Sequence, residues 1–201
     1  MIRENLLFFK EFLQEFENTG TCFPTSRQAA RALAQPVLES CAPKKILELG
    51  PGTGSVTVEI LRAMREGDEL AICEINPRFM EALKERLHDN PDYIRHRARI
   101  RFFQCAAQEL PENQHYDVIV CALPFLNFTP EVVAEIFQKI ERLSHPDSVM
   151  TYYEYIGLRK LGMTVAAPPR KQRIKEINNF YRNLASRWRI SRRKLVQHAS
   201  H

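Results

Sequence analysis

The sequence lacks several features that would assign it to a class at once. No apolar run approaches the roughly 20 residues that a membrane-spanning helix needs, so we expect no transmembrane segment. The first residues show no basic stretch followed by an apolar one, so we expect no signal peptide. The five cysteines form no C-x-x-C pair and the six histidines form no H-x-x-x-H spacing. We therefore predict a cytoplasmic protein without a metal site.

The length and composition are those of one ordinary globular domain. The chain has 201 residues, of which 44% are hydrophobic and 26% are charged, which is enough for a sizeable core. The net charge of +5 is unevenly spread, because residues 170–194 hold ten Lys or Arg and one acid. That segment carries +9, and the rest of the chain therefore carries −4. An anionic partner of the segment would explain this asymmetry, and so would a solvated helix face.

The stretch around which the chain is organised is Ile46-Leu47-Glu48-Leu49-Gly50-Pro51-Gly52-Thr53-Gly54-Ser55. It predicts a buried strand that turns through three glycines into a helix capped by Ser55. Such a turn presents backbone N–H groups and the positive end of a helix dipole to a ligand. A second run, Leu70-Ala71-Ile72-Cys73-Glu74, ends in a carboxylate that can accept both hydroxyl groups of a ribose. Together the two stretches predict a cofactor site.

Hydrophobic patterning predicts strands that alternate with helices from residue 44 onward. The predicted strands cover 45–49, 69–75, 100–104, 116–121 and 149–155, the predicted helices cover 56–65, 77–88 and 130–144, and 90–97 is a connection. This alternation predicts an α/β fold, a Rossmann-like doubly wound and mostly parallel sheet. Ligands of such sheets lie outside the carboxyl ends of the strands.

Further elements are predicted on either side of this region. Residues 2–17 predict an amphipathic helix that packs either on the core or on a membrane surface. Residues 171–186 predict a basic helix, and 188–197 an antiparallel strand.

A second N-terminal helix is predicted over 27–40, with Thr25 or Ser26 as its N-cap. Pro36 should kink or divide this helix. We therefore divide the chain into an N-terminal helical extension or lid, 1–43, and a core, 44–201, that ends in the basic segment.

The spacing E-x-G-x-G-x-G resembles motif I of the class I S-adenosylmethionine-dependent methyltransferases. In that family the loop holds the methionine end and the ribose of the cofactor, so the resemblance implies S-adenosylmethionine here. It also implies the set of cofactor contacts, which are Glu48, Gly50, Gly52, Gly54, Glu74, Ala106, Ala107 and Ala122.

A longer resemblance, over residues 1–160, is to the bacterial phospholipid N-methyltransferases. It rests on the N-terminal helix and on four motifs: Phe23–Ala34, E-L-G-P-G-T-G, A-L-P-F-L-N-F and Tyr152-Tyr153-Glu154-Tyr155. It implies that the enzyme methylates phosphatidylethanolamine, that its partner is the phospholipid surface, and that it is bound peripherally at the inner membrane. The chain departs from the family at Cys105-Ala106-Ala107, which offers no acid to the adenine amino group, at Pro146-Asp147-Ser148, and in the basic tail.

The resemblance also implies where the acceptor binds. Leu123, Pro124 and Phe125 follow the fourth strand and would wall the acceptor site. Arg27 is a candidate contact of the lipid phosphate, together with Arg170, Lys171 and Arg173 in the basic segment.

Methylation of an amine requires that its nitrogen first lose a proton, and a nearby carboxylate or carbonyl would assist this. The candidate catalytic residues are Tyr152, Glu154 and Tyr155, with Asp117 as a further carboxylate. Aromatic faces also stabilise a methylated ammonium.

Two alternatives remain open. The A-L-P-F motif also resembles the N-L-P-Y/F of adenine-N6 methyltransferases, including ribosomal RNA dimethylases, but Ala122 replaces the asparagine that would orient an adenine amino group. RNA is therefore the less favoured partner, although the basic tail suits a phosphate backbone. The chain could also be a non-catalytic lipid- or RNA-binding module that keeps the cofactor loop. The oligomeric state is not predicted.

Overall fold

The structure is a computed structural model that describes residues 26–39, 43–125 and 128–152. Its elements, in chain order, are α2 (Arg27–Glu39), β1 (Lys45–Leu49), α3 (Ser55–Ala63), β2 (Glu69–Cys73), α4 (Pro77–Leu87), α5 (Pro91–His96), the 3₁₀ turn η1 (Arg97–Arg99), β3 (Ile100–Phe103), the 3₁₀ turn η2 (Ala107–Glu109), β4 (Tyr116–Cys121), α6 (Pro130–Arg142) and β5 (Ser144–Tyr152). The elements predicted over 2–17, 171–186 and 188–197 lie outside the described residues.

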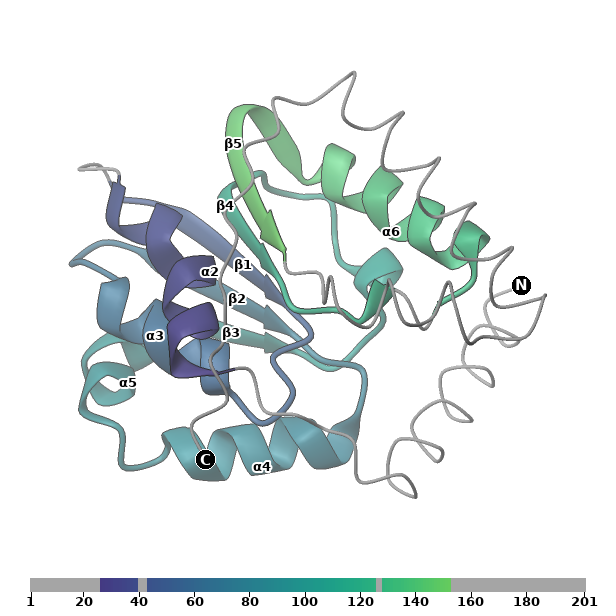
Figure 1. The fold of residues 1–201 in the computed structure, drawn as a ribbon. Coiled ribbons are helices and arrows are strands. Elements are labelled where there is room, and N and C mark those ends of the chain that lie inside the picture. The colour runs from purple at the N-terminus through teal and green to yellow at the C-terminus, as the bar shows by residue number, and fades with distance from the viewer. Residues whose placement is uncertain (1–25, 40–42, 126–127, 153–201) are drawn as a thin grey trace.

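The five described strands form one sheet in the order β3-β2-β1-β4-β5, and every neighbouring pair is parallel (Figure 1). The chain moves outward from β1 to β3 and then returns to the other side of β1 with β4. The direction of winding therefore changes between β1 and β4, whose carboxyl ends mark the place where such sheets bind ligands. The predicted α/β Rossmann-like fold is confirmed.

Two apolar layers cover the two faces of this sheet. Successive side chains of a strand point to opposite faces, so Ile46 joins the layer of α2, α3 and α4 while Leu47 joins the layer of α6. Figure 1 shows α6 on one side of the sheet and α2 with α3 on the other. Because α2 buries Ala30, Leu33 and Val37 in the first layer, this part of the predicted extension packs on the core.

Three helices begin at a polar cap followed by proline. Asn76, Asn90 and Thr129 each accept hydrogen bonds from backbone N–H groups of the first turn, and the proline that follows has the φ angle a helix needs. The helices that follow Asn76 and Thr129 begin at Pro77 and Pro130, where helices were predicted to begin. The helix α5 after Asn90 was predicted to be a connection, which is wrong. Only His96 of its six residues is buried, so no apolar periodicity marks it.

Other boundaries differ for identifiable reasons. The N-cap of α3 is Gly54 in the left-handed conformation, and Ser55, the predicted cap, is the first helical residue. Helix α2 runs through Pro36 without division, with Ser26 Oγ accepting from the backbone N–H of Ala29 at 3.2 Å. Strand β5 begins at Ser144 rather than at 149, because it continues past a register irregularity opposite Tyr116.

Candidate functional site

The glycine loop joins the carboxyl end of β1 to α3 at the centre of the sheet. The backbone N–H of Gly50 donates to the carbonyl of Cys73 at 2.9 Å, and that of Gly54 donates to the carbonyl of Pro51 at 2.9 Å. Gly50, Gly52 and Gly54 have φ angles of 70°, 54° and 85°, in the region that side chains disfavour. The three glycines are therefore required by the path of the backbone.

The space around these glycines differs from one to the next. A Cβ atom at Gly50 would lie 2.6 Å from Cδ2 of Leu123, and one at Gly54 would lie 2.4 Å from Cδ1 of Leu83. A Cβ atom at Gly52 would meet no atom within 4 Å among the residues that the structure describes. Two glycines thus allow close packing of the protein on itself, and Gly52 leaves its backbone open to a ligand.

Glu74 follows β2 and is fastened to this loop. Its Oε2 accepts from the backbone N–H of Gly52 at 3.2 Å, and its Oε1 accepts from that of Asn76 at 2.8 Å. The residue is 5% exposed. Burial raises the pKa of Glu74 above its ordinary value, although the hydrogen bonds from Asn76 and Gly52 oppose the rise. The carboxylate predicted to hold a ribose therefore lies beside the open glycine.

Glu48 lies within β1 and is completely buried. Neither of its carboxyl oxygens has a hydrogen-bond partner within the described ranges, and neither has the buried hydroxyl of Thr57. The pKa of Glu48 is raised to about 8, mainly by burial and to a smaller extent by the charge of Glu74, while the nearby hydroxyl of Thr57 opposes the rise. Glu48 is thus a neutral acid near pH 7 under the glycine loop, and its predicted direct contact with the cofactor stays a prediction.

The other predicted cofactor residues lie at the same edge of the sheet. The backbone N–H of Ala122 donates to the carbonyl of Leu49 at 2.8 Å, which joins the ends of β4 and β1. The backbone N–H of Ala106 donates to Oε2 of Glu109 at 3.0 Å, so this donor is already used. Ala106, Ala107 and Ala122 are all partly exposed, as a ligand contact requires.

The predicted acceptor residues divide into surface and core. Leu123 and Pro124 are partly exposed beside the glycine loop. Phe125 is 4% exposed, and its ring centroid lies 5.1 Å from that of Phe137 and 6.3 Å from that of Tyr152. Phe125 therefore supports the acceptor loop from the core, and its predicted contact with the substrate stays a prediction. Tyr152 ends β5 opposite Cys121, so its half-buried ring lies next to this loop.

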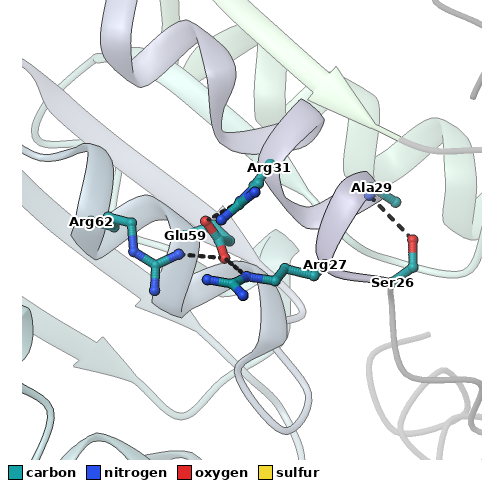
Figure 2. Close-up of polar contacts among 6 residues, drawn as sticks. All are labelled: Ser26, Arg27, Ala29, Arg31, Glu59 and Arg62. Carbon is teal, nitrogen blue, oxygen red and sulfur yellow. Dashed lines mark hydrogen bonds and ion pairs between the residues drawn. The ribbon is translucent and has the colours of Figure 1, made fainter.

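Arg27 belongs to a cluster of three arginines around Glu59, shown in Figure 2. Glu59 accepts from Nε of Arg27 at 3.4 Å, Nε of Arg31 at 3.3 Å and Nη1 of Arg62 at 2.6 Å. The arginine side chains are 68%, 57% and 46% exposed, whereas Glu59 is 7% exposed. Burial raises the pKa of Glu59, but the three arginines outweigh that effect and bring it below its ordinary value. The cluster has a net charge of +2 and joins α2 to α3.

One candidate is misplaced. Asp117 lies near the start of β4, at the amino edge of the sheet, where it accepts from the backbone N–H of Lys45 at 2.7 Å and pairs with His145 at 3.0 Å. The carboxylate is therefore at the wrong edge to take a proton from an acceptor.

Five other candidates lie outside the described residues: Glu154, Tyr155, Arg170, Lys171 and Arg173.

Sequence reasoning missed three arginines of this region. Nη1 of Arg86, on α4, donates to the carbonyl of Thr53 at 3.0 Å and fastens the glycine loop. No local pattern indicates this contact, because 33 positions separate the two residues. The sequence did contain a local indication of Arg31 and Arg62. Arg27 and Arg31 are four positions apart, and Glu59 and Arg62 are three apart, so each pair lies on one face of a helix.

Two features are absent from the described ranges. None of the helices there has the length and apolar character that crossing a bilayer requires. Within the same ranges no three His, Cys, Asp or Glu side chains are grouped as metal ligands.

Comparison with known proteins places this geometry among methyltransferases. The chain is 30% identical over 86 residues to the ubiquinone/menaquinone biosynthesis C-methyltransferase UbiE of Azotobacter vinelandii, covering 42% of this chain and 32% of that protein. It is 32% identical over 87 residues to the dimethyladenosine transferase of Yarrowia lipolytica, covering 43% and 25%. The chain thus spans a third or less of the length of these curated relatives.

A solved structure shows the same fold. The O-methyltransferase TomG of Streptomyces achromogenes, determined in complex with S-adenosylmethionine, superposes with a TM-score of 0.64 at 18% identity and covers 90% of this chain and 78% of that one. The model of the methyltransferase domain family matches residues 46–147, from the first strand of the sheet to the beginning of the last. These residues are more than half of the sequence, and the chain therefore belongs to the methyltransferase domain family.

Proposed function

We propose that this chain transfers the methyl group of S-adenosylmethionine to the ethanolamine nitrogen of a phospholipid at a membrane surface. S-adenosylmethionine is the cofactor, and when bound it supplies an electrophilic methyl group. The observation that carries the methyl-donor part of the proposal is the buried carboxylate of Glu74, held against the open backbone of Gly52 at 3.2 Å.

The site residues fit that cofactor. Glu74 offers carboxylate oxygens to ribose hydroxyls. Gly52 exposes a backbone that a side chain would cover. Ala106 and Ala107 leave room for a flat base at the end of β3. Glu48 stays uncharged below this loop, so the cofactor meets one carboxylate, Glu74, and not two. The cofactor of the TomG structure is the same compound.

The acceptor side fits a small amine. The partly exposed loop Ala122–Pro124 lies beside the glycine loop, and Tyr152 lies next to it with its ring held by Phe125. An aromatic face attracts a cationic ammonium, and the attraction persists as methylation makes the charge permanent. Most of the acceleration would come from positioning of the nitrogen, because the described residues place no strong base at this edge.

The anionic part of the substrate has a candidate contact as well. The cluster of Arg27, Arg31 and Arg62 keeps a net charge of +2 after Glu59 is counted, and all three side chains face solvent. Arginine binds phosphate with paired, charge-assisted hydrogen bonds. This cluster suits a phosphodiester headgroup and a peripheral position on an anionic bilayer.

The experiment incubates the purified full chain with radiolabelled S-adenosylmethionine and with vesicles of phosphatidylethanolamine, with or without phosphatidylglycerol. A parallel reaction contains ribosomal RNA. We expect label in mono-, di- or trimethylated lipid, and more of it when phosphatidylglycerol is present. The double variant Arg27→Ala/Arg31→Ala should lose the response to phosphatidylglycerol, while Arg101→Ala, on the edge strand β3, should keep it.

Other acceptors are the competing outcomes. Label in RNA alone would overturn the lipid proposal in favour of an adenine methyltransferase, the activity named for the Yarrowia lipolytica relative. The burial of Phe125 is unfavourable to that outcome, because a base could not stack on a ring that is 4% exposed. Bound cofactor without label in any acceptor would overturn the lipid proposal and leave the non-catalytic module.

A further inference from the structure

Two cysteines meet at the cofactor edge of the sheet. Cys73 is the last residue of β2, and Cys105 follows the neighbouring strand β3. Their Sγ atoms are 4.0 Å apart, and Sγ of Cys73 donates to the carbonyl oxygen of Cys105 at 3.3 Å. A disulfide requires an Sγ–Sγ distance of about 2.05 Å, so the two sulfur atoms would move about 2 Å toward each other to form one.

The two thiols differ in the way that oxidation requires. Cys105 is partly exposed and Cys73 is buried. A hydrogen bond from the thiol of Cys73 to the sulfur of Cys105, across the 4.0 Å that separates the two Sγ atoms, lowers the pKa of Cys105, and the charge of Lys139 adds to this, while burial and Glu109 oppose it. The same hydrogen bond, with burial, raises the pKa of Cys73. Cys105 is therefore the accessible thiol with more thiolate character, and Cys73 is the protected thiol behind it.

We propose that Cys73 and Cys105 form a hydroperoxide-sensitive thiol pair whose disulfide weakens cofactor binding at Glu74. The first step is attack by the Cys105 thiolate on the peroxide: an S–O bond forms, the O–O bond breaks, and an alcohol or water leaves after taking a proton. The sulfur of Cys105 is oxidised to a sulfenic acid and the peroxide is reduced. The Cys73 sulfur then attacks that of Cys105. An S–S bond forms, the S–O bond breaks, and the hydroxide leaves as water with the proton of Cys73.

The position of the pair connects this chemistry to the site. Cys73 precedes Glu74 directly, and its carbonyl accepts from the backbone N–H of Gly50. Cys105 precedes Ala106, and Phe103, two residues before Cys105, accepts from the backbone N–H of Glu74 at 3.0 Å. Drawing the two sulfur atoms together would shift Glu74 relative to Gly52. The effect on the cofactor rests on the proposed function, whereas formation of the disulfide does not.

The test uses the full chain with Cys22→Ser and Cys41→Ser, which leaves Cys73, Cys105 and Cys121. The protein is treated with hydrogen peroxide and its thiols are counted in denaturant. We expect the count to fall from three to one, with a peptide that joins Cys73 to Cys105 in the mass spectrum and free Cys121. Cys121 is the internal control, because it is fully buried and burial raises its pKa to about 12.

Single variants assign the roles of the two thiols. In Cys73→Ser, Cys105 should accumulate as a sulfenic acid that a dimedone-type reagent traps, and in Cys105→Ser the remaining thiols should survive. Cys121→Ser should form the disulfide as the parent does. Unfolding midpoints of all variants show whether each is folded. A disulfide that includes Cys121, or loss of thiols without a Cys73–Cys105 peptide in the folded parent, would overturn the proposal.

Cofactor affinity is measured on the same samples. The oxidised protein should bind S-adenosylmethionine about tenfold more weakly, as expected for the loss of one hydrogen bond to a charged group, and dithiothreitol should restore the affinity. Unchanged affinity after complete oxidation would overturn the regulatory part of the proposal. Reduced protein that binds no cofactor would instead contradict the proposed function, and the thiol counts would still decide whether the pair reacts.

Discussion

Gly52 donates its backbone N–H to the carboxylate of Glu74 at 3.2 Å, across 22 positions of sequence. This bond joins the turn after β1 to the end of β2, so the two parts of the cofactor site are held at a fixed separation before any ligand arrives. A site arranged in this way loses less conformational entropy on binding. Changes at either residue should therefore affect affinity more than they affect the stability of the fold.

Glu74→Gln should weaken binding of S-adenosylmethionine by about tenfold to a hundredfold, because an amide offers the ribose one acceptor oxygen in place of a carboxylate. Unfolding stability should fall by only about 1 kcal/mol, since one of the two backbone N–H donors loses its acceptor. Isothermal titration calorimetry and urea unfolding measure the two effects. Glu69→Gln, at the other end of β2, is the matched control. Equal affinity in the two variants would contradict the assigned role of Glu74.

Substitutions of Gly52 and Gly54 should have different effects on cofactor binding and on the stability of the fold. Gly52→Ala adds a methyl group where no described atom lies within 4 Å, so its cost to stability is the positive φ angle, about 1 kcal/mol. The Gly52→Ala variant should nevertheless lose its affinity for S-adenosylmethionine, because the added methyl group fills the space that the ligand needs. Gly54→Ala places Cβ 2.4 Å from Leu83 and should cost about 3 kcal/mol or more. Thermal unfolding and cofactor titration of both variants decide this. Retained affinity in a folded Gly52→Ala variant would place the cofactor elsewhere.

Glu48 should make stability depend on pH. Its pKa is about 8 in the folded chain and 4.5 ordinarily, so between these values the folded state binds a proton that the unfolded state has lost. The contribution of Glu48 is therefore complete below pH 4.5 and is lost as pH rises through 8. Glu48→Gln, which imitates the protonated acid, should gain stability over the parent across this window, on the order of 4 kcal/mol by pH 8. Urea unfolding of both proteins at pH 5, 6.5 and 8 measures the difference, and a difference independent of pH would contradict the burial of a neutral acid.

Glu59 should hold α2 on α3 through Arg27 and Arg31, while Arg62 pairs with it from α3 itself. Glu59→Gln leaves those arginines without a charged partner and should lower stability by about 1 kcal/mol, a modest amount because the arginines are half exposed or more. Since the pKa of Glu59 is below its ordinary value, its stabilisation is present above that ordinary value and is lost as pH falls through the lowered one. Glu66→Gln, exposed beyond the end of α3, is the control, and equal urea midpoints for the two variants at pH 7 would show that the cluster is not stabilising.

Much of the architecture could be predicted because its signals are local. The strand over Tyr116–Cys121 was predicted with both ends correct, and the caps Asn76 and Thr129 each precede a proline that starts a helix. Helix α5 has the same start, at Asn90, yet was missed because five of its six residues are not buried. The beginning of strand β5 was predicted five residues late, because Pro146 and Asp147 are residue types that strands disfavour.

The candidate site was predictable only in part. The glycine loop and Glu74 can each be recognised from a short sequence pattern, and the sheet topology brings the ends of β1 and β2 together. The contact of Arg86 with Thr53, the meeting of Cys73 with Cys105, and the burial of Phe125 all join residues that are distant in sequence or depend on packing. Such contacts follow from which helices cover which face, and a linear pattern does not encode them. The family model shows that the chain belongs to the methyltransferase domain family, whereas methyl transfer by this chain and its lipid acceptor stay proposals.

The side chain of Leu123 occupies the volume in which a Cβ atom of Gly50 would stand. The glycine turn and the loop that faces the second substrate are thus packed against each other. They are also joined by the hydrogen bond that the backbone N–H of Ala122 donates to the carbonyl of Leu49. A molecule that settles on the first loop also sets the shape of the second. The two substrates should consequently enter in a fixed sequence, the methyl donor leading, and steady-state inhibition by the demethylated product should be competitive toward the donor alone.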